Sequence, residues 1–167
     1  KGAFVVEERI PGAAASIVKL GEHATIRISP SDSNERQRFS IAHELGHLLM
    51  GHLESIQKAC TNADMLNWHQ SSHETQANFF ASELILPTSL VGQRCDVAKV
   101  NFDPIRAISQ DFKASLTATA IKFVRLCPEK CAVVYSSEGK VKWFYKSPDW
   151  WPFIKRDQNL DERTLAY

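Results

Sequence analysis

The chain has 167 residues, 44% of them hydrophobic and 23% charged, and a formal net charge of +1 at pH 7. These values suit one soluble globular domain, or one domain with a small appendage, and exclude a strong overall attraction to nucleic acid. No apolar run approaches the roughly 20 residues that cross a bilayer, so no membrane partner is expected. The chain shows no secretory signal and no initiator Met, and we therefore expect a cytoplasmic protein whose chain begins inside a longer polypeptide.

The first segment has the pattern of a small β-sheet. Three short runs rich in β-branched residues, at 3–7, 17–20 and 24–28, are separated by loops that contain Gly or Pro. In the third run, Thr25-Ile26-Arg27-Ile28 alternates between polar and apolar residues, as a half-buried strand does.

A helix is expected from Ser33 to Met50, with Asp32 as N-cap, Glu35 at position N3 and Gly51 as the C′ residue. Its core-facing stripe is predicted at steps of three and four residues, at Phe39, Ala42, Leu45 and Leu49. The middle of this helix carries His43-Glu44-Leu45-Gly46-His47, a His-Glu-x-x-His pattern.

This pattern indicates a catalytic metal. Residues four apart share a helix face, so His43 and His47 can direct two imidazoles at one ion. Glu44 is rotated by about 100°, which places its carboxylate beside the metal as a base for a water molecule. Zinc hydrolysis needs this arrangement. An ordinary amphipathic helix with polar residues on its rim is the alternative interpretation.

Catalytic zinc usually has three protein ligands. The extended pattern with Gly and a third His is not followed, because Met50 and Leu53 stand at those positions. His52 is one residue early, and we expect it to be a cation near the helix C-terminus rather than a ligand. Residues 54–70 lack periodicity, and the part around Trp68 is predicted as a loop that flanks the cleft.

A second helix is expected from Ser71 to Pro87, with Ser71 as N-cap and Ala77, Phe80, Ala81 and Leu84 buried. Glu74 and Asn78 share a face, so Glu74 can bind the metal and Asn78 can hydrogen-bond a ligand imidazole. Two alternatives stay open on the residues alone. Glu74 can instead complete a capping box with Ser71, and Glu83 is a rival ligand.

Two blocks of sequence now resemble the ImmA/IrrE family of metallopeptidases. One runs from Arg38 to His47, and the other is Glu74-x-x-Ala77-Asn78-x-Phe80-Ala81-x-x-Leu84-x-Leu86-Pro87. The resemblance implies a minimal zinc peptidase of the gluzincin type, with Zn²⁺ bound by His43, His47 and Glu74 and with Glu44 as the catalytic base. It also favours Glu74 over Glu83. Family members are usually intracellular, and several cut a helix-turn-helix repressor, so the resemblance implies such a protein as substrate.

After Pro87, two helices are expected in a helix-turn-helix layout. One has Asp103 as N-cap and Pro104 at N1, and the other runs from Ser115 to Leu126. Packing on the peptidase core is favoured for this pair, but a non-catalytic regulator that binds protein or DNA, with a structural or vestigial metal site, is the alternative function. In that interpretation the recognition helix presents Thr117, Thr119, Lys122 and Arg125. A β-hairpin is expected at 131–136 and 140–146.

The expected fold is therefore α+β, a small mixed β-sheet backed by the active-site helices, with additional C-terminal helices and a β-hairpin. Residues 1–92 are predicted to form the peptidase core, and residues 93–167 an extension packed on it. The four cysteines are expected to be free thiols, at Cys60, Cys95, Cys127 and Cys131. A second zinc site at Cys127 and Cys131 and a thiol-switched sensor are weaker alternatives. Manganese or iron can also occupy a site with two histidines and one carboxylate.

Overall fold

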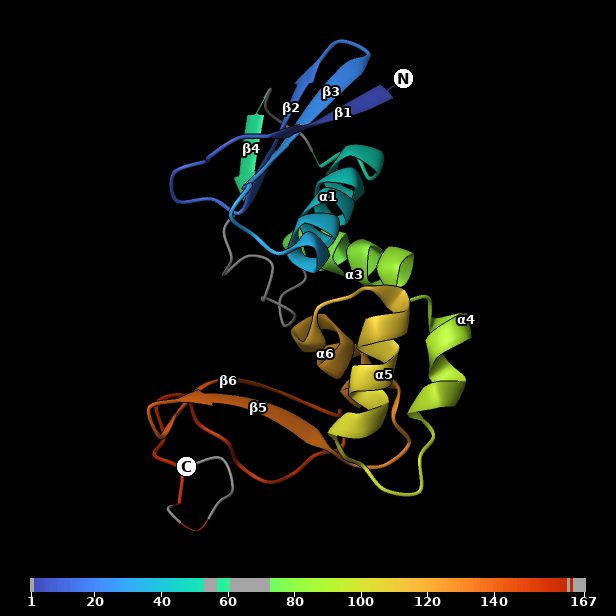
Figure 1. Ribbon diagram of the computed structural model, residues 1–167, viewed down its shortest axis with the longest axis vertical. Helices are drawn as coiled ribbons and strands as arrows, with labels where there is room; N and C mark the ends of the chain where they lie inside the picture. Colours follow the sequence, from blue (N-terminus) through green and yellow to red (C-terminus); the bar gives the residue numbers. More distant parts are fainter. Residues whose placement is uncertain (1, 53–56, 61–72, 162, 164–167) are drawn as a thin grey trace. The chain divides into compact units, whose positions relative to one another are not determined.

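The computed structural model describes residues 2–52, 57–60, 73–161 and 163. They form an α+β fold in which strands β1 to β3 come before helix α1, and β4 before helix α3 (Figure 1). The chain divides into two compact units, Lys1–Pro87 with Phe112–Ser115, and Thr88–Asp111 with Leu116–Tyr167. The predicted packing of a C-terminal extension on the core stays a prediction. Within the described ranges, no helix combines the length and apolarity that a bilayer crossing requires.

The first unit contains a four-stranded mixed sheet in the order β1-β3-β2-β4. β1 (Gly2–Glu7) pairs parallel with β3 (His23–Ile28), and β2 (Ala15–Leu20) pairs antiparallel with β3. These are the three predicted strands. The alternation predicted for β3 is confirmed, because Ile26 and Ile28 are buried while Thr25 and Arg27 are only partly buried.

The fourth strand, β4 (Gln57–Cys60), lies in the segment 54–70, where the sequence shows no periodicity and predicts no strand. β4 pairs antiparallel with β2, in a register that sets Ala15 opposite Cys60. The four residues of β4 have no clear alternation of their own, and the strand exists because β2 presents an edge to pair with. The Trp68 region of the predicted loop lies outside the described residues.

Helix α1 (Asn34–Leu49) begins one residue later than the sequence predicts. Ser33 is the N-cap, and its hydroxyl accepts a hydrogen bond from the backbone N–H of Arg36 at 3.4 Å. The prediction of Asp32 as N-cap is therefore wrong; its carboxylate instead forms a 3.9 Å ion pair with Arg36, four residues on. The expected end is confirmed, since Met50 is the C-cap and Gly51 has a left-handed φ of 75°.

One face of α1 packs on the sheet. The sheet contributes a core cluster that includes Ile17, Ile26 and Ile28. The partly buried residues of α1 that pack against this cluster are Phe39, Ile41, Leu45 and Leu48. Leu49, predicted in this stripe, is 69% exposed, so that position is wrong. At 100° per residue, Ile41, Leu45 and Leu48 fall within about 60° of one another, and Leu49 lies outside that sector. His43 and His47 also lie outside that sector.

Helix α3 (His73–Ile85) packs against α1. Ala77 and Ala81 are fully buried, as predicted, whereas Leu84 is 55% exposed and Ile85 takes its place in the interior. At 100° per residue, Ile85 lies within about 20° of Glu74 and Asn78, the two α3 residues that contact His43 of α1. The predicted N-cap, Ser71, lies outside the described residues.

The second unit contains a helical part and a hairpin. Its elements are α4 (Thr88–Val91), the 3₁₀ helix η1 (Gly92–Cys95), α5 (Phe102–Phe112), α6 (Leu116–Leu126), β5 (Ala132–Ser137) and β6 (Lys140–Lys146). The hairpin is as predicted, and its turn has Glu138 and Gly139 at positive φ.

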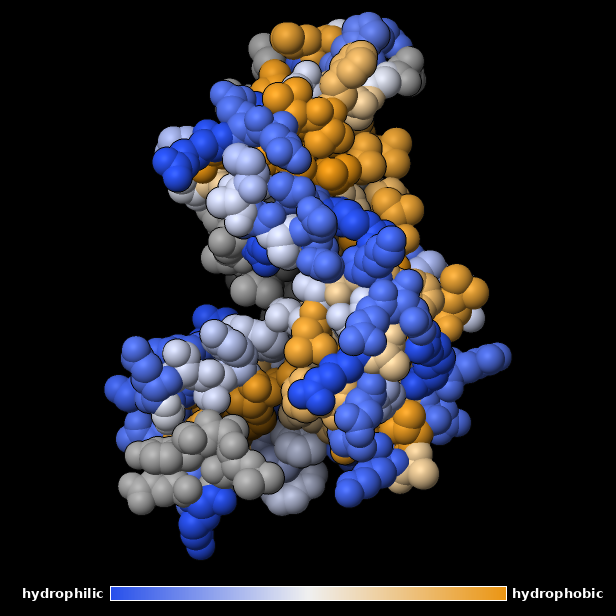
Figure 2. All heavy atoms as spheres, in the orientation of Figure 1, coloured by the Kyte–Doolittle hydropathy of each residue, from blue (hydrophilic) through white to orange (hydrophobic). Residues whose placement is uncertain are grey.

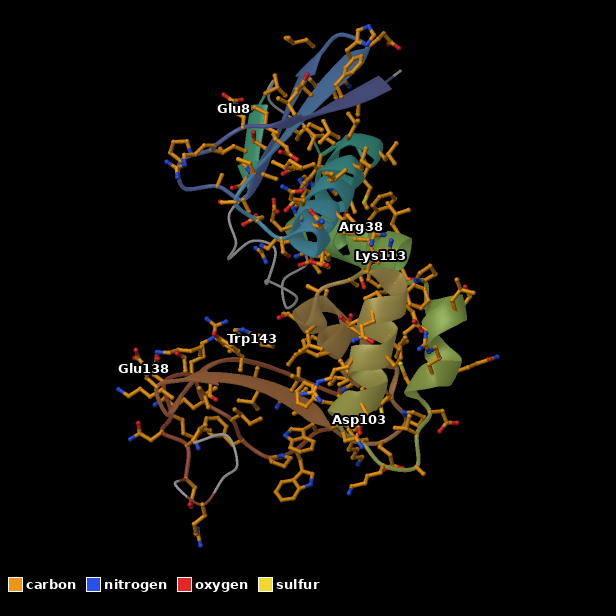
Figure 3. The ribbon with its side chains drawn as sticks, viewed as in Figure 1. Glu8, Arg38, Asp103, Lys113, Glu138 and Trp143 are labelled. Carbon is orange, nitrogen blue, oxygen red and sulfur yellow. The ribbon has the colours of Figure 1, made fainter. Side chains whose placement is uncertain are left out.

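The prediction of Asp103 as the N-cap of α5 is wrong, because α5 already begins at Phe102. The side-chain oxygen of Asn101 accepts a hydrogen bond of 2.9 Å from the backbone N–H of Asp103, a residue labelled in Figure 3.

A short segment from Phe112 to Ser115 belongs to the first unit. Arg38 of α1 donates from Nη1 to the carbonyl oxygens of Phe112, at 2.9 Å, and Lys113, at 2.5 Å. Figure 3 shows Arg38 and Lys113 side by side. Lys113 has a left-handed φ of 49°, so the arginine donates to the carbonyl oxygens of a tight chain reversal after α5.

Apolar side chains are also exposed at the sheet edge. Figure 2 shows them gathered beside β1 and along α1, where Phe4, Val5 and Leu49 are among the exposed residues. All six residues of β1 are exposed, so this strand contributes main-chain pairing with β3 rather than core burial.

Candidate metal centre

Helix α1 presents two imidazoles at one point. His43 and His47 are four residues apart, which places them on the same helix face one turn apart. Both side chains are fully buried, and their Nε2 atoms are 3.0 Å apart.

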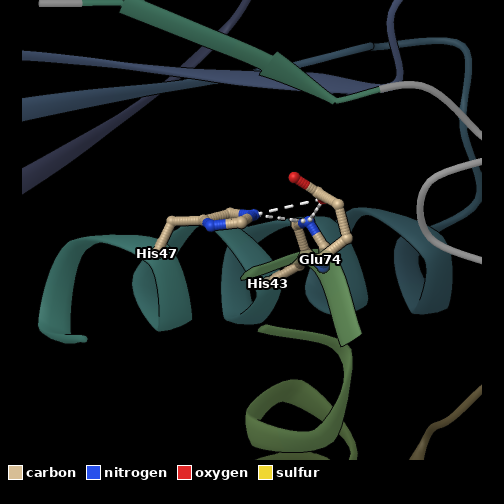
Figure 4. A group of neighbouring side chains, drawn as sticks. All are labelled: His43, His47 and Glu74. Atoms are coloured by element: carbon tan, nitrogen blue, oxygen red, sulfur yellow. Dashed lines mark hydrogen bonds and ion pairs between the residues drawn. The ribbon is translucent and has the colours of Figure 1, made fainter. Parts of the chain in front are cut away.

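Helix α3 adds a carboxylate from its first turn. Oε2 of Glu74 lies 3.2 Å from Nε2 of His43 and 3.3 Å from Nε2 of His47 (Figure 4). In the part of the chain that the structure describes, these three residues form the group of His, Cys, Asp and Glu side chains that can hold a metal ion. Glu83, the rival from the sequence, is outside that group.

A glycine permits the two helices to approach closely enough. A Cβ atom built on Gly46 would lie 3.2 Å from the Cα of Ala77 and 3.2 Å from Cδ1 of Phe80. Such contacts are tighter than side chains normally make, and one of them is to backbone that cannot rotate away. Gly46 inside the His-Glu-x-x-His pattern is therefore what brings Glu74 within reach of the imidazoles.

The outer nitrogen of His43 is held by an amide. Nδ1 of His43 lies 3.0 Å from Oδ1 of Asn78, which is fully buried on α3, as the sequence suggested for this asparagine. An amide oxygen only accepts hydrogen bonds, so Nδ1 of His43 donates. In the neutral ring, Nε2 then has no proton, and its lone pair points toward His47 and Glu74.

The donor set fits zinc. The three donor atoms are separated by 3.0, 3.2 and 3.3 Å. A tetrahedral zinc ion with bonds about 2.0 Å long separates its ligand atoms by about 3.3 Å. Two imidazoles and one carboxylate also match a known class of catalytic zinc site, in which a fourth position stays open. Three converging acceptor atoms need a cation between them, and the spacing suits a metal of this size.

Glu44, the predicted base, is fully buried on α1 next to His43 in the chain. It is not one of the three residues grouped as metal ligands. A proton acceptor must be a carboxylate that does not itself bind the metal, and the position of Glu44 beside His43 on α1 meets this requirement. The catalytic role of Glu44 stays a prediction.

The model of the peptidase M78 family, described as the IrrE N-terminal-like domain, matches residues 2–123. The chain belongs to this family. The match confirms the resemblance inferred from the two helix motifs. It also extends past Pro87, through α5 and into α6. No match was found among curated proteins.

Sequence reasoning missed one residue of this M78 site. His52 is 8% exposed, and its Nδ1 lies 3.2 Å from Nδ1 of His47, so it is neither a ligand nor only a surface cation. It also stacks on His73 with ring centroids 4.2 Å apart. No spacing rule locates His52, because its position depends on the left-handed turn at Gly51 that follows α1.

The described cysteines of the M78 protein are not part of the group that can hold a metal. Cys95, Cys127 and Cys131 are buried free thiols of the second unit, and none of the described cysteines joins a group that can hold a metal. Burial raises the pKa of Cys95 and of Cys131 to about 11. Both thiols therefore stay protonated near neutral pH, which makes them poor nucleophiles and poor metal ligands.

Helix α6 does not have the exposed polar face of a DNA-recognition helix. Two of the four polar side chains proposed for that role, Thr119 and Lys122, are each only 1% exposed. Nζ of Lys122 donates to Oγ1 of Thr88 at 2.9 Å, inside the second unit. These two residues serve the interior of their own unit, which weakens the DNA-binding alternative.

Proposed function

We propose that this M78-family protein is a zinc-dependent endopeptidase. The observation that carries the proposal is the convergence of His43, His47 and Glu74, whose donor atoms have the separations of a tetrahedral zinc site. Membership of a peptidase family supports the reaction class. His43, His47 and Glu74 would hold the ion.

Zinc bound there would acidify a water molecule and polarise the carbonyl of the scissile peptide bond. Glu44 accepts the proton of the attacking water and passes it to the leaving amine. Asn78 keeps the ring of His43 in the orientation that the ligand role requires.

The substrate that we propose is a helix-turn-helix transcription repressor, cut in the cytoplasm. The support is the resemblance to ImmA/IrrE peptidases. The alternative of a non-catalytic DNA-binding regulator has less support, because Thr119 and Lys122 of its would-be recognition helix are buried.

Glu44→Gln tests the proposed base, because glutamine keeps the shape of the side chain and cannot accept the proton. New N-termini would be counted by mass spectrometry in a bacterial lysate incubated with either protein. We expect cleavage by the wild type to fall at least about 100-fold in the variant, with zinc content unchanged. Cleavage that survives the substitution would rule out Glu44 as the base.

A further inference from the structure

The outer nitrogen of His47 faces a second imidazole instead of an amide. Nδ1 of His47 lies 3.2 Å from Nδ1 of His52, and Nε2 of His52 lies 2.9 Å from Oε1 of Gln76. The backbone N–H of His52 donates to the carbonyl oxygen of His47 at 3.0 Å, which holds the turn after α1 in place. His47, His52 and Gln76 thus form a continuous chain of hydrogen bonds from the metal centre to α3.

The chemistry of the last member sets the direction of this chain. The amide oxygen of Gln76 only accepts, so Nε2 of His52 carries the proton. Nδ1 of the neutral His52 ring is then an acceptor, and it accepts from Nδ1–H of His47. His47 is left with a bare Nε2, the atom that lies 3.0 Å from Nε2 of His43.

We infer that His52 and Gln76 are positioning residues that fix the ring orientation and the tautomer of the metal ligand His47. The reverse direction would put a proton on Nε2 of His47, where it would occupy the place of the metal. This inference rests on the proposed metal site. Its consequence is that α3 serves both ligand histidines, since Asn78 accepts from His43 directly and Gln76 accepts from His47 through His52.

The first test measures zinc affinity by competition with a chromogenic chelator. His52→Leu removes the acceptor for His47, and we expect affinity to fall about 10-fold to 100-fold. His52→Asn places an amide oxygen near the position of Nδ1 and should restore affinity to within a few-fold of wild type. His23→Leu, at an exposed histidine of β3, is the matched control and should bind as wild type does.

A second variant separates positioning from loss of packing. We expect Gln76→Leu to weaken zinc binding in the wild type but to have no effect in the His52→Asn background, where the ring that connects Gln76 to His47 is gone. Equal losses in both backgrounds, or wild-type affinity in His52→Leu, would overturn the inference. Circular dichroism of the metal-free protein shows whether His52→Leu folds. If it does not fold, the comparison of Gln76→Leu in the wild-type and His52→Asn backgrounds still tests the inference.

The direction of the chain has a spectroscopic test that does not depend on activity. In zinc-loaded protein labelled with ¹⁵N-histidine, long-range ¹H–¹⁵N spectra should show His52 protonated on Nε2 and His47 on Nδ1. A proton on Nδ1 of His52 would overturn the assignment. A wild type that binds zinc but cuts nothing would defeat only the proposed peptidase activity, whereas a wild type that binds no zinc would defeat both.

Discussion

Glu74 lies in the first turn of α3, within 3.2 and 3.3 Å of the two imidazoles, and Glu83 lies in the last turn of the same helix. The two histidines were predictable from sequence because the i,i+4 geometry of a helix needs no tertiary information. The choice between the two glutamates was not predictable from local pattern, since it depends on how α3 crosses α1. His52 was missed for the same reason, because its contact with His47 depends on a turn.

The ligand assignment predicts a clear difference between two variants. Glu74→Ala removes one of three donors, so we expect it to lose zinc after dialysis. Glu83→Ala should keep one zinc ion per chain. Metal analysis by mass spectrometry of both variants beside the wild type is the measurement. Loss of zinc in Glu83→Ala alone would contradict the assignment of the third ligand.

At the scale of elements, strands and helices with strong periodicity were predictable, and their ends and inner faces were less so. The choice of Ser33 over Asp32 as N-cap, and of Leu48 over Leu49 in the stripe, depends on one-residue shifts that packing decides. β4 was not predictable, because four residues without alternation become a strand only through pairing with β2.

The close contact of α1 with α3 predicts the effect of Gly46→Ala. In an open helix this change stabilises by up to about 1 kcal/mol, but overpacking costs about 1–3 kcal/mol. The new methyl would meet the backbone of Ala77, so we expect net destabilisation by about 1 kcal/mol and weaker zinc binding. Urea unfolding and zinc titration measure the two effects. Gly92→Ala, where a Cβ meets nothing within 4 Å, is the control. A Gly46→Ala protein as stable as wild type would refute the contact.

At the scale of the whole molecule, the α+β class followed from the order of the patterns, strands before two motif-bearing helices and then helices and a hairpin. The expected division into a core of residues 1–92 and an extension of residues 93–167 stays a prediction. Local pattern did not place the segment Phe112–Ser115 in the first unit, because the hydrogen bonds from Arg38 join residues more than 70 positions apart.

The three proposed metal ligands all lie in the first unit, so zinc should stabilise the two units unequally. A ligand at 1,000 times its Kd adds about 4 kcal/mol to the state that binds it. We expect zinc to slow amide hydrogen exchange in α1 and α3 and to leave the β5–β6 hairpin nearly unchanged. Exchange measured by mass spectrometry with zinc and with EDTA tests this. Equal protection of the hairpin would contradict a metal effect confined to the first unit.

X-ray absorption at the zinc edge tests the central assignment most directly, because it identifies the atoms bound to the metal. The account predicts one zinc ion per chain with only nitrogen and oxygen neighbours, at about 2.0–2.2 Å, and with the outer scattering of two imidazoles. A sulfur neighbour at about 2.3 Å would move the metal to the cysteines and contradict the proposed centre.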